Sequence, residues 1–237
     1  MLLITPWRAV PLAFFRTHCH VILGLLVLAA LDVSRASSHA SSGVAGVIAG
    51  AAVLAFLASV SWGLGLPRVG VPLTAGMVVA TGAVLVAASR AASGELWALN
   101  GAGRVASAFL MGSTLTAMLL GHHYLTAPAM SIDPLRRFVR CMAWALAIRA
   151  GVAALGFWAW RSGAFAPSAV VPVSTFFLTV RWGVGFLGPA LATVLTWKTV
   201  EIRSTQSATG ILYIAMTLVL FGELTALVLS QGSGVIF

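Results

Sequence analysis

Charged residues are scarce in this sequence, and acidic ones most of all. Of the 237 residues, 8% are charged and only five are Asp or Glu, whereas 60% are hydrophobic. The mean hydropathy is +1.02. A soluble domain of this length needs far more polar surface, so water is excluded as the main solvent. We expect an integral membrane protein in a lipid bilayer, and we assign it to the bacterial inner (plasma) membrane.

Patterns that mark several other protein classes are missing. The two cysteines, Cys19 and Cys141, form neither a disulfide framework nor a CxxC zinc pattern. The single lysine, Lys198, precedes the last apolar segment, which excludes a retinal pigment with its Schiff-base lysine there. Phosphate-binding loops, HExxH zinc motifs and GxSxG nucleophile motifs are absent from the sequence, so nucleotide-driven and hydrolytic mechanisms lack their residues. The net charge of +9 comes from dispersed basic residues, which argues against nucleic acid as a partner.

Long apolar segments dominate the sequence. A helix needs roughly 20 apolar residues to cross the hydrocarbon core of a bilayer, and seven segments reach this length. Their continuous apolar character excludes a membrane β-barrel, whose strands alternate apolar and polar residues. We predict one all-α transmembrane domain over residues 1–237, a bundle of about seven helices. The expected bounds are Val10–Asp32, Val44–Leu66, Val69–Ser89, Val105–Thr126, Phe138–Trp160, Thr175–Trp197 and Ala208–Ser230.

Basic residues outside these segments predict the orientation, because positively charged loops tend to stay in the cytoplasm. Eight of them lie on the side of the N-terminus and four on the other side, which favours a cytoplasmic N-terminus and an external C-terminus. The eight are Arg8, Arg16, Arg68, Arg136, Arg137, Arg140, Lys198 and Arg203. The four are Arg35, Arg90, Arg104 and Arg161.

Two glycines in the second predicted helix, Gly46 and Gly50, are spaced four residues apart. This spacing of small residues lets a neighbouring backbone approach closely in a membrane. We interpret the pair as a helix-packing contact.

Three ionisable residues lie deep inside predicted helices. Arg149, Arg181 and Glu223 fall in the central part of the fifth, sixth and seventh segments. Because charge is costly in lipid, such groups pair inside the bundle, either as a packing clamp or as a site for binding or proton movement. Two arginines to one glutamate leave a positive excess, which suits an anion such as a haem propionate, a quinone oxygen or a lipid phosphate. Glu223 is the candidate proton relay.

Histidines form a second group of candidates. His18 and His20 lie near the start of the first predicted helix, and His122 and His123 lie near the end of the fourth, so both pairs belong to the cytoplasmic leaflet. Each helix aims only one of its two imidazoles at a common centre, because neighbouring positions diverge by about 100° and alternate ones by about 200°. One histidine from each helix, such as His20 with His122, predicts axial ligation of haem b iron. Arg16, Arg149 and Arg181 are the candidate partners of the propionates.

Two other interpretations of these residues stay open. Cys19 and Cys141, with one or two of the histidines, would suit copper. Alternatively, the histidines only donate hydrogen bonds between helices or face lipid headgroups.

The segment from Gly121 to Pro128, with sequence GHHYLTAP, resembles the double-histidine segment of the haem-copper oxidase and nitric oxide reductase superfamily. The resemblance covers eight residues and implies that His122 and His123 are metal ligands, with His18 or His20 as an early haem ligand. That superfamily needs further histidines later in the chain, and none follows His123. The resemblance therefore implies haem or quinone chemistry and not the reduction of oxygen or nitric oxide.

A polar segment precedes the last predicted helix. Glu201, Arg203 and Gln206 are clustered there in an otherwise apolar region. The cluster is either a docking site for a partner or an ordinary solvated turn.

Three functions are compatible with these patterns. The leading one is a membrane subunit of an electron-transfer or respiratory complex, which binds haem b, a quinone or both and associates with other subunits. The second is a transporter or channel that uses Arg149, Arg181 and Glu223. The third is a cofactor-free anchor that docks a partner through the polar segment. Whether the chain is part of an enzyme stays open.

Overall fold

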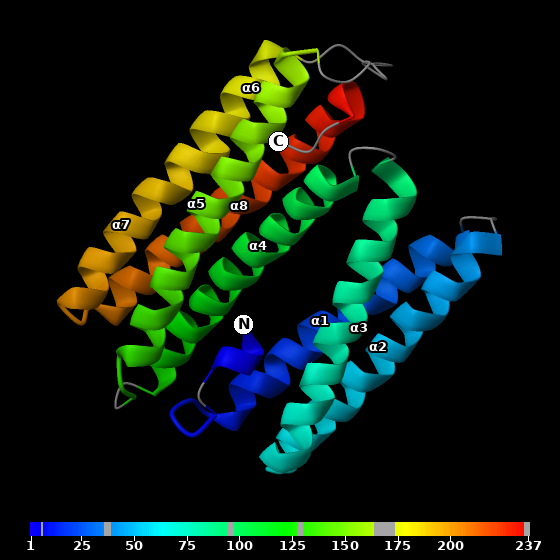
Figure 1. The fold of residues 1–237 in the computed structure, drawn as a ribbon. Coiled ribbons are helices and arrows are strands. Elements are labelled where there is room, and N and C mark those ends of the chain that lie inside the picture. The colour runs from blue at the N-terminus through cyan, green and yellow to red at the C-terminus, as the bar shows by residue number, and fades with distance from the viewer. Residues whose placement is uncertain (6, 36–38, 94–96, 128–129, 164–173, 235–237) are drawn as a thin grey trace. The chain divides into compact units, whose positions relative to one another are not determined.

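The computed structural model describes residues 1–5, 7–35, 39–93, 97–127, 130–163 and 174–234. The side chains of residues 39–42, 90–93, 126 and 232 are not described. Within the described ranges every regular element is helical, which confirms the all-α prediction. Among the described residues, seven helical segments are long and apolar enough to cross a membrane, as predicted. The chain is therefore a polytopic membrane protein (Figure 1).

The chain divides into two compact units, Met1–Ala88 and Ser89–Phe237. The first unit contains the short helix η1 (Leu2–Ile4), α1 (Leu12–Arg35), α2 (His39–Gly63) and most of α3 (Pro67–Ser93). Helix α1 packs along α2, where the rings of Phe15 and Trp62 stack with their centroids 4.4 Å apart. The Trp62 indole N–H donates to Thr74 Oγ1 at 3.2 Å and links α2 to α3. This unit carries His18, His20 and Cys19.

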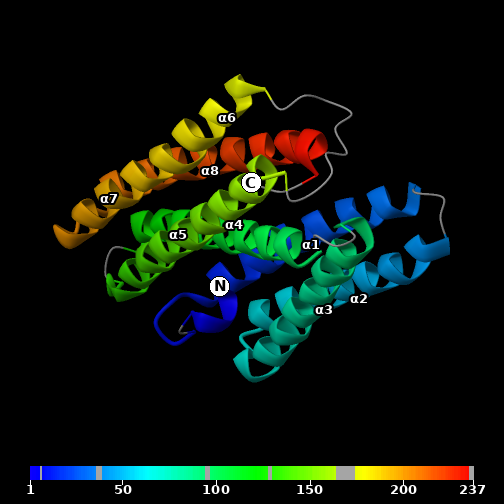
Figure 2. The same ribbon diagram turned by 45° about the horizontal axis from the view of Figure 1, so that its top comes forward.

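The second unit is built from four membrane-crossing segments. They are α4 (Trp97–Thr126), α5 (Asp133–Arg161), the combined segment α6 (Thr175–Trp182), η3 (Gly183–Leu187) and α7 (Gly188–Glu201), and α8 (Thr205–Ser233). Helix α8 packs against α4, α6, η3 and α7, while α5 packs against α4 and α7 (Figures 1 and 2). The core between them includes Leu110, Leu146, Phe186 and Val219. The four segments thus surround one buried core, and α8 packs against most of the helices that form it.

Helix α4 begins at Trp97, about two turns before the predicted start at Val105. The intervening Asn, Gly and Arg residues are typical of a loop, which is why the prediction placed Arg104 outside the helix. In the structure Asn100 is buried, and its amide donates to the carbonyl oxygen of Gly234 at 3.1 Å. Because Gly234 ends α8 in a left-handed conformation, this bond ties the start of α4 to the end of α8.

The sixth predicted helix is interrupted by a π-helical turn, η3, which the sequence pattern did not predict. Three glycines, Gly183, Gly185 and Gly188, lie in or next to this turn, and Pro189 follows at the start of α7. A π-helical turn adds a residue to one turn of a helix and occurs often at functional sites.

Large apolar side chains cover the outside of both units. Among those more than two-thirds exposed are Leu64 and Val79 in the first unit, and Trp144, Trp158 and Phe176 in the second. Exposed apolar surface of this extent is unfavourable in water. In a bilayer these side chains face lipid, as the membrane assignment requires.

The close approach expected at Gly46 and Gly50 is not found within the first unit. A Cβ atom added at either glycine meets no atom within 4 Å. Among the described residues, a close glycine–glycine crossing lies instead in the second unit, between η3 and α8.

Candidate functional site

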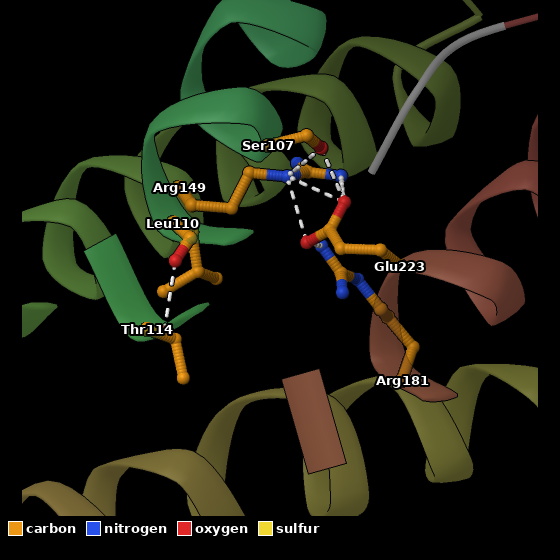
Figure 3. A network of polar contacts seen from close by, with 6 residues as sticks. All are labelled: Ser107, Leu110, Thr114, Arg149, Arg181 and Glu223. Carbon is orange, nitrogen blue, oxygen red and sulfur yellow. Dashed lines mark hydrogen bonds and ion pairs between the residues drawn. The ribbon is translucent and has the colours of Figure 1, made fainter. Parts of the chain in front are cut away.

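The buried charged side chains of the second unit meet at one point. Glu223 of α8 lies between Arg149 of α5 and Arg181 of α6, three residues that the sequence analysis had grouped by depth (Figure 3). Arg149 donates to Glu223 Oε2 from Nε at 3.3 Å and from Nη2 at 3.2 Å, and its Nε also lies 3.2 Å from Oε1. Arg181 donates from Nη2 to Oε1 at 3.1 Å. One carboxylate therefore bridges two guanidinium groups from different helices.

A fourth helix contributes Ser107, which the sequence analysis missed. The hydroxyl of Ser107 in α4 donates to Glu223 Oε2 and accepts a hydrogen bond from Arg149 Nε at 3.0 Å. A lone serine in a long apolar helix is common and gives no signal of its own, since its hydroxyl usually bonds its own backbone. We refer to Ser107, Arg149, Arg181 and Glu223 as the charge cluster.

The charge cluster is almost completely removed from solvent. Arg149 and Arg181 are 0% exposed and Glu223 is 7% exposed. Two formal positive charges thus face one negative charge in a buried volume. Transferring charges from water into the protein interior costs free energy, and the cost is greatest for a charge that has no opposite charge beside it. The cluster therefore keeps a net positive charge that favours a further anion.

The residues of the cluster lie nearer to one end of their membrane-crossing segments than to the other. Counting about 1.5 Å per residue, Arg181 is roughly 9 Å from the start of α6, and Glu223 roughly 15 Å from the end of α8. By the same count, Arg149 is about 18 Å from the end of α5, and Ser107 about 15 Å from the start of α4. All four helix ends belong to the face that the distribution of basic residues predicts to be external.

Two glycines allow the carboxylate and Arg181 to approach. A Cβ atom added at Gly185 of η3 would lie 2.8 Å from Cα of Gly222 in α8. It would also lie 3.2 Å from Nη1 of Arg181. Since Gly222 directly precedes Glu223, this backbone crossing fixes the carboxylate beside the guanidinium group. Larger residues at these positions would separate η3 from α8.

Phe186 lies against the other side of Arg181. The guanidinium carbon of Arg181 is 4.1 Å from the centroid of the Phe186 ring, a favourable cation–π distance. Within the described residues, Nε and Nη1 of Arg181 are buried and have no hydrogen-bond partner. A guanidinium has five N–H donors. Arg181 therefore retains donors for an acceptor besides Glu223.

The histidines of the first unit differ in their surroundings. His18 is buried, its Nδ1 lies 2.9 Å from the carbonyl oxygen of Phe14, and its ring packs on that of Phe14. His20 is exposed and lines a pocket of about 400 Å³ together with Arg16, Ser59 and Gly63. Arg16 thus lies next to His20, as a haem propionate partner would.

The histidines of the second unit end α4. His122 is exposed, and Nδ1 of the half-buried His123 lies 2.9 Å from the carbonyl oxygen of Leu119 in the preceding turn. Haem ligation by His20 and His122 needs one histidine from each unit, and the same holds for copper with Cys19 and Cys141. Groups of three or more His, Cys, Asp or Glu that would hold a metal ion are absent from the described residues. The haem and copper assignments stay predictions.

The polar segment before α8 forms a tight turn. The indole N–H of Trp197 donates to Glu201 Oε1 at 2.7 Å, and Arg203 adopts a positive φ of 57°. Glu201, Arg203 and Gln206 are all exposed. Partner docking through these residues stays a prediction.

Family models, curated proteins and solved structures yield no match to this chain. The functional argument therefore depends on the geometry of the chain's own residues. Among those, the charge cluster brings four side chains together within one unit.

Proposed function

We propose that the protein is a membrane transporter or channel whose substrate path contains the charge cluster, and that its substrate is a small monovalent oxyanion. The observation that carries this proposal is a buried carboxylate shared by two fully buried guanidinium groups. The two arginines already hold one carboxylate, so their geometry suits another carboxylate or a similar planar oxyanion. The spare donors of Arg181 give such an anion a place to bind.

The charge balance couples the anion to a proton. With Glu223 ionised, the cluster carries one net positive charge, and its carboxylate occupies the donors that an incoming anion needs. When Glu223 is protonated, its hold on Arg149 and Arg181 weakens and the net charge rises by one. Binding of a monovalent anion then restores the original charge. A proton and an anion bound together therefore leave the buried charge unchanged, which avoids the large cost of an extra charge in lipid.

The other groups around Glu223 support this exchange. Ser107 from α4 is a neutral hydrogen-bond partner, and η3 contributes Gly185, which does not titrate. Arg104 lies one turn before Ser107 on α4 and is half-buried. Lys198 and Glu201 of α7 lie at the opposite end of that segment. Glu223 is thus the acidic group of the cluster, and positive groups face it from two helices.

Anion uptake into liposomes tests the proposal. Purified protein in liposomes is expected to take up radiolabelled lactate, or nitrate, faster when the outside is acidic than when both sides have equal pH. Glu223→Gln keeps the shape of the side chain and removes its charge, so proton-driven accumulation is expected to be abolished.

Glu201→Gln is the matched control, because it removes an exposed carboxylate and leaves the charge cluster intact. Its uptake is expected to equal that of the unaltered protein. If neither lactate nor nitrate enters faster than into protein-free liposomes, or if Glu223→Gln accumulates them normally, the proposal is wrong and the cluster only holds the helices together.

A further inference from the structure

An apolar groove runs along the outside of the second unit, between α5 and the segment formed by η3 and α7. Its volume is about 530 Å³. The α5 side is lined mainly by the small residues Ala143, Ala147 and Ala150, and the opposite side includes Phe186 and Val194. Alanines spaced three and four residues apart share one face of a helix, so this face of α5 leaves space beside its neighbour.

The groove offers few polar groups. Thr193 contributes a hydroxyl, which already donates to the carbonyl oxygen of Pro189 in its own helix at 2.7 Å. Trp182 contributes an indole N–H, and the remaining lining side chains are apolar. A polar solute would therefore lose hydrogen bonds to water on entering, whereas a hydrocarbon chain would not.

Basic residues continue both walls of the groove toward one membrane face. Arg140 lies three residues before Ala143 on α5, and Lys198 lies four residues after Val194 on α7, so each continues the helix face that lines the groove. Both are exposed. As consecutive membrane-crossing segments, α5 and α7 run antiparallel, which brings the first turns of α5 and the last turns of α7 to the same end (Figure 1).

We propose that this groove binds an anionic phospholipid, with an acyl chain against the alanine face and the phosphate between Arg140 and Lys198. Charge complementarity decides the occupant, because basic groups beside an apolar groove at a helix end recognise anionic headgroups. Ala150 lies about 15 Å along the helix from Arg140, a length that accommodates much of an acyl chain. This inference does not depend on the transport proposal.

Native mass spectrometry of the detergent-purified protein tests it with two lipids of equal chain length. Phosphatidylglycerol is expected to bind more tightly than phosphatidylcholine. Arg140→Gln or Lys198→Gln should weaken phosphatidylglycerol binding about fivefold, and both together about thirtyfold, because each basic group contributes a similar amount. Ala147→Trp fills the groove and should remove the bound lipid.

Matched controls separate this site from general surface attraction. Arg161→Gln removes an exposed arginine at the opposite end of the same helix, and Ile148→Trp adds an indole at an exposed position of α5 that does not line the groove. Both should bind phosphatidylglycerol as the unaltered protein does. The proposal would be overturned if the protein retained both lipids equally or preferred a neutral isoprenoid quinone. It would also be overturned if the unaltered protein were a dimer that Ala147→Trp converts to a monomer, because a second copy of the chain would then cover the groove.

Discussion

At the scale of single residues, the number of partners of Glu223 determines how much each substitution in the charge cluster lowers the stability of the protein. Glu223 accepts hydrogen bonds from Ser107, Arg149 and Arg181, while the two arginines share this one carboxylate. Loss of the carboxylate leaves two buried positive charges without compensation. Loss of one arginine leaves a balanced pair. The two kinds of substitution should therefore differ strongly in their effect on stability.

Glu223→Gln is expected to lower the free energy of unfolding by about 3–5 kcal/mol, the usual cost of removing one partner of a buried ion pair. Arg181→Gln should cost distinctly less, since Arg149 still neutralises Glu223. Denaturant unfolding of the detergent-purified variants measures both. Equal losses would show that the net charge of the cluster does not control its energy.

The charged members of this cluster were predictable from the sequence, and their neighbours were not. Arg149, Arg181 and Glu223 are conspicuous because ionisable residues are rare inside membrane helices. Ser107 and Phe186 have no such signal, since serine and phenylalanine are ordinary residues there. The contact between Gly185 and Gly222 joins glycines of two different helices, so no spacing within one helix shows it. Gly46 and Gly50 had the familiar spacing and make no such contact within their unit.

At the scale of secondary-structure elements, the crossing of η3 and α8 positions the cluster. The π-helical turn begins two residues after Arg181, and Gly222 directly precedes Glu223. The local geometry of two elements thus places the guanidinium and the carboxylate together. The sequence predicted the helix Thr175–Trp197 with its start correct, but hydrophobicity alone does not distinguish a π-helical turn from an α-helical one.

Gly222→Ala is expected to destabilise the second unit, because its Cβ atom would meet the backbone of Gly185. Overpacking of this kind typically costs about 1–3 kcal/mol. Gly210→Ala on the same helix is the control, since a Cβ atom there meets nothing within 4 Å. Thermal unfolding in detergent compares the two, and a Gly222→Ala protein as stable as Gly210→Ala would contradict the crossing.

At the scale of the whole molecule, the sequence predicted the architecture well because the bilayer imposes it. Seven apolar segments were expected, and the described part of the chain contains seven helices long and apolar enough to cross a membrane, since a backbone in lipid must satisfy its own hydrogen bonds. Function is less constrained by composition. The haem prediction depends on histidines from two separate units, whereas the charge cluster is contained in one.

An absorption spectrum of the purified protein checks the haem prediction on its own. If His20 or His18 and His122 or His123 ligate haem b, a Soret band should be present and should disappear when His122 and His123 are both replaced by Ala. A colourless, folded preparation would reject haem binding. Neither result depends on the anion transport assay.

Proton uptake on anion binding tests the role of the charge cluster most directly. Lactate or nitrate is titrated into the detergent-purified protein in weak buffer, with a pH indicator to count protons and calorimetry to count bound anions. We predict uptake of about one proton for each bound anion, because Glu223 must give up its hold on the two arginines. Glu223→Gln should bind the anion without taking up a proton. Anion binding to the unaltered protein without proton uptake, or equal uptake by Glu223→Gln, would contradict the account.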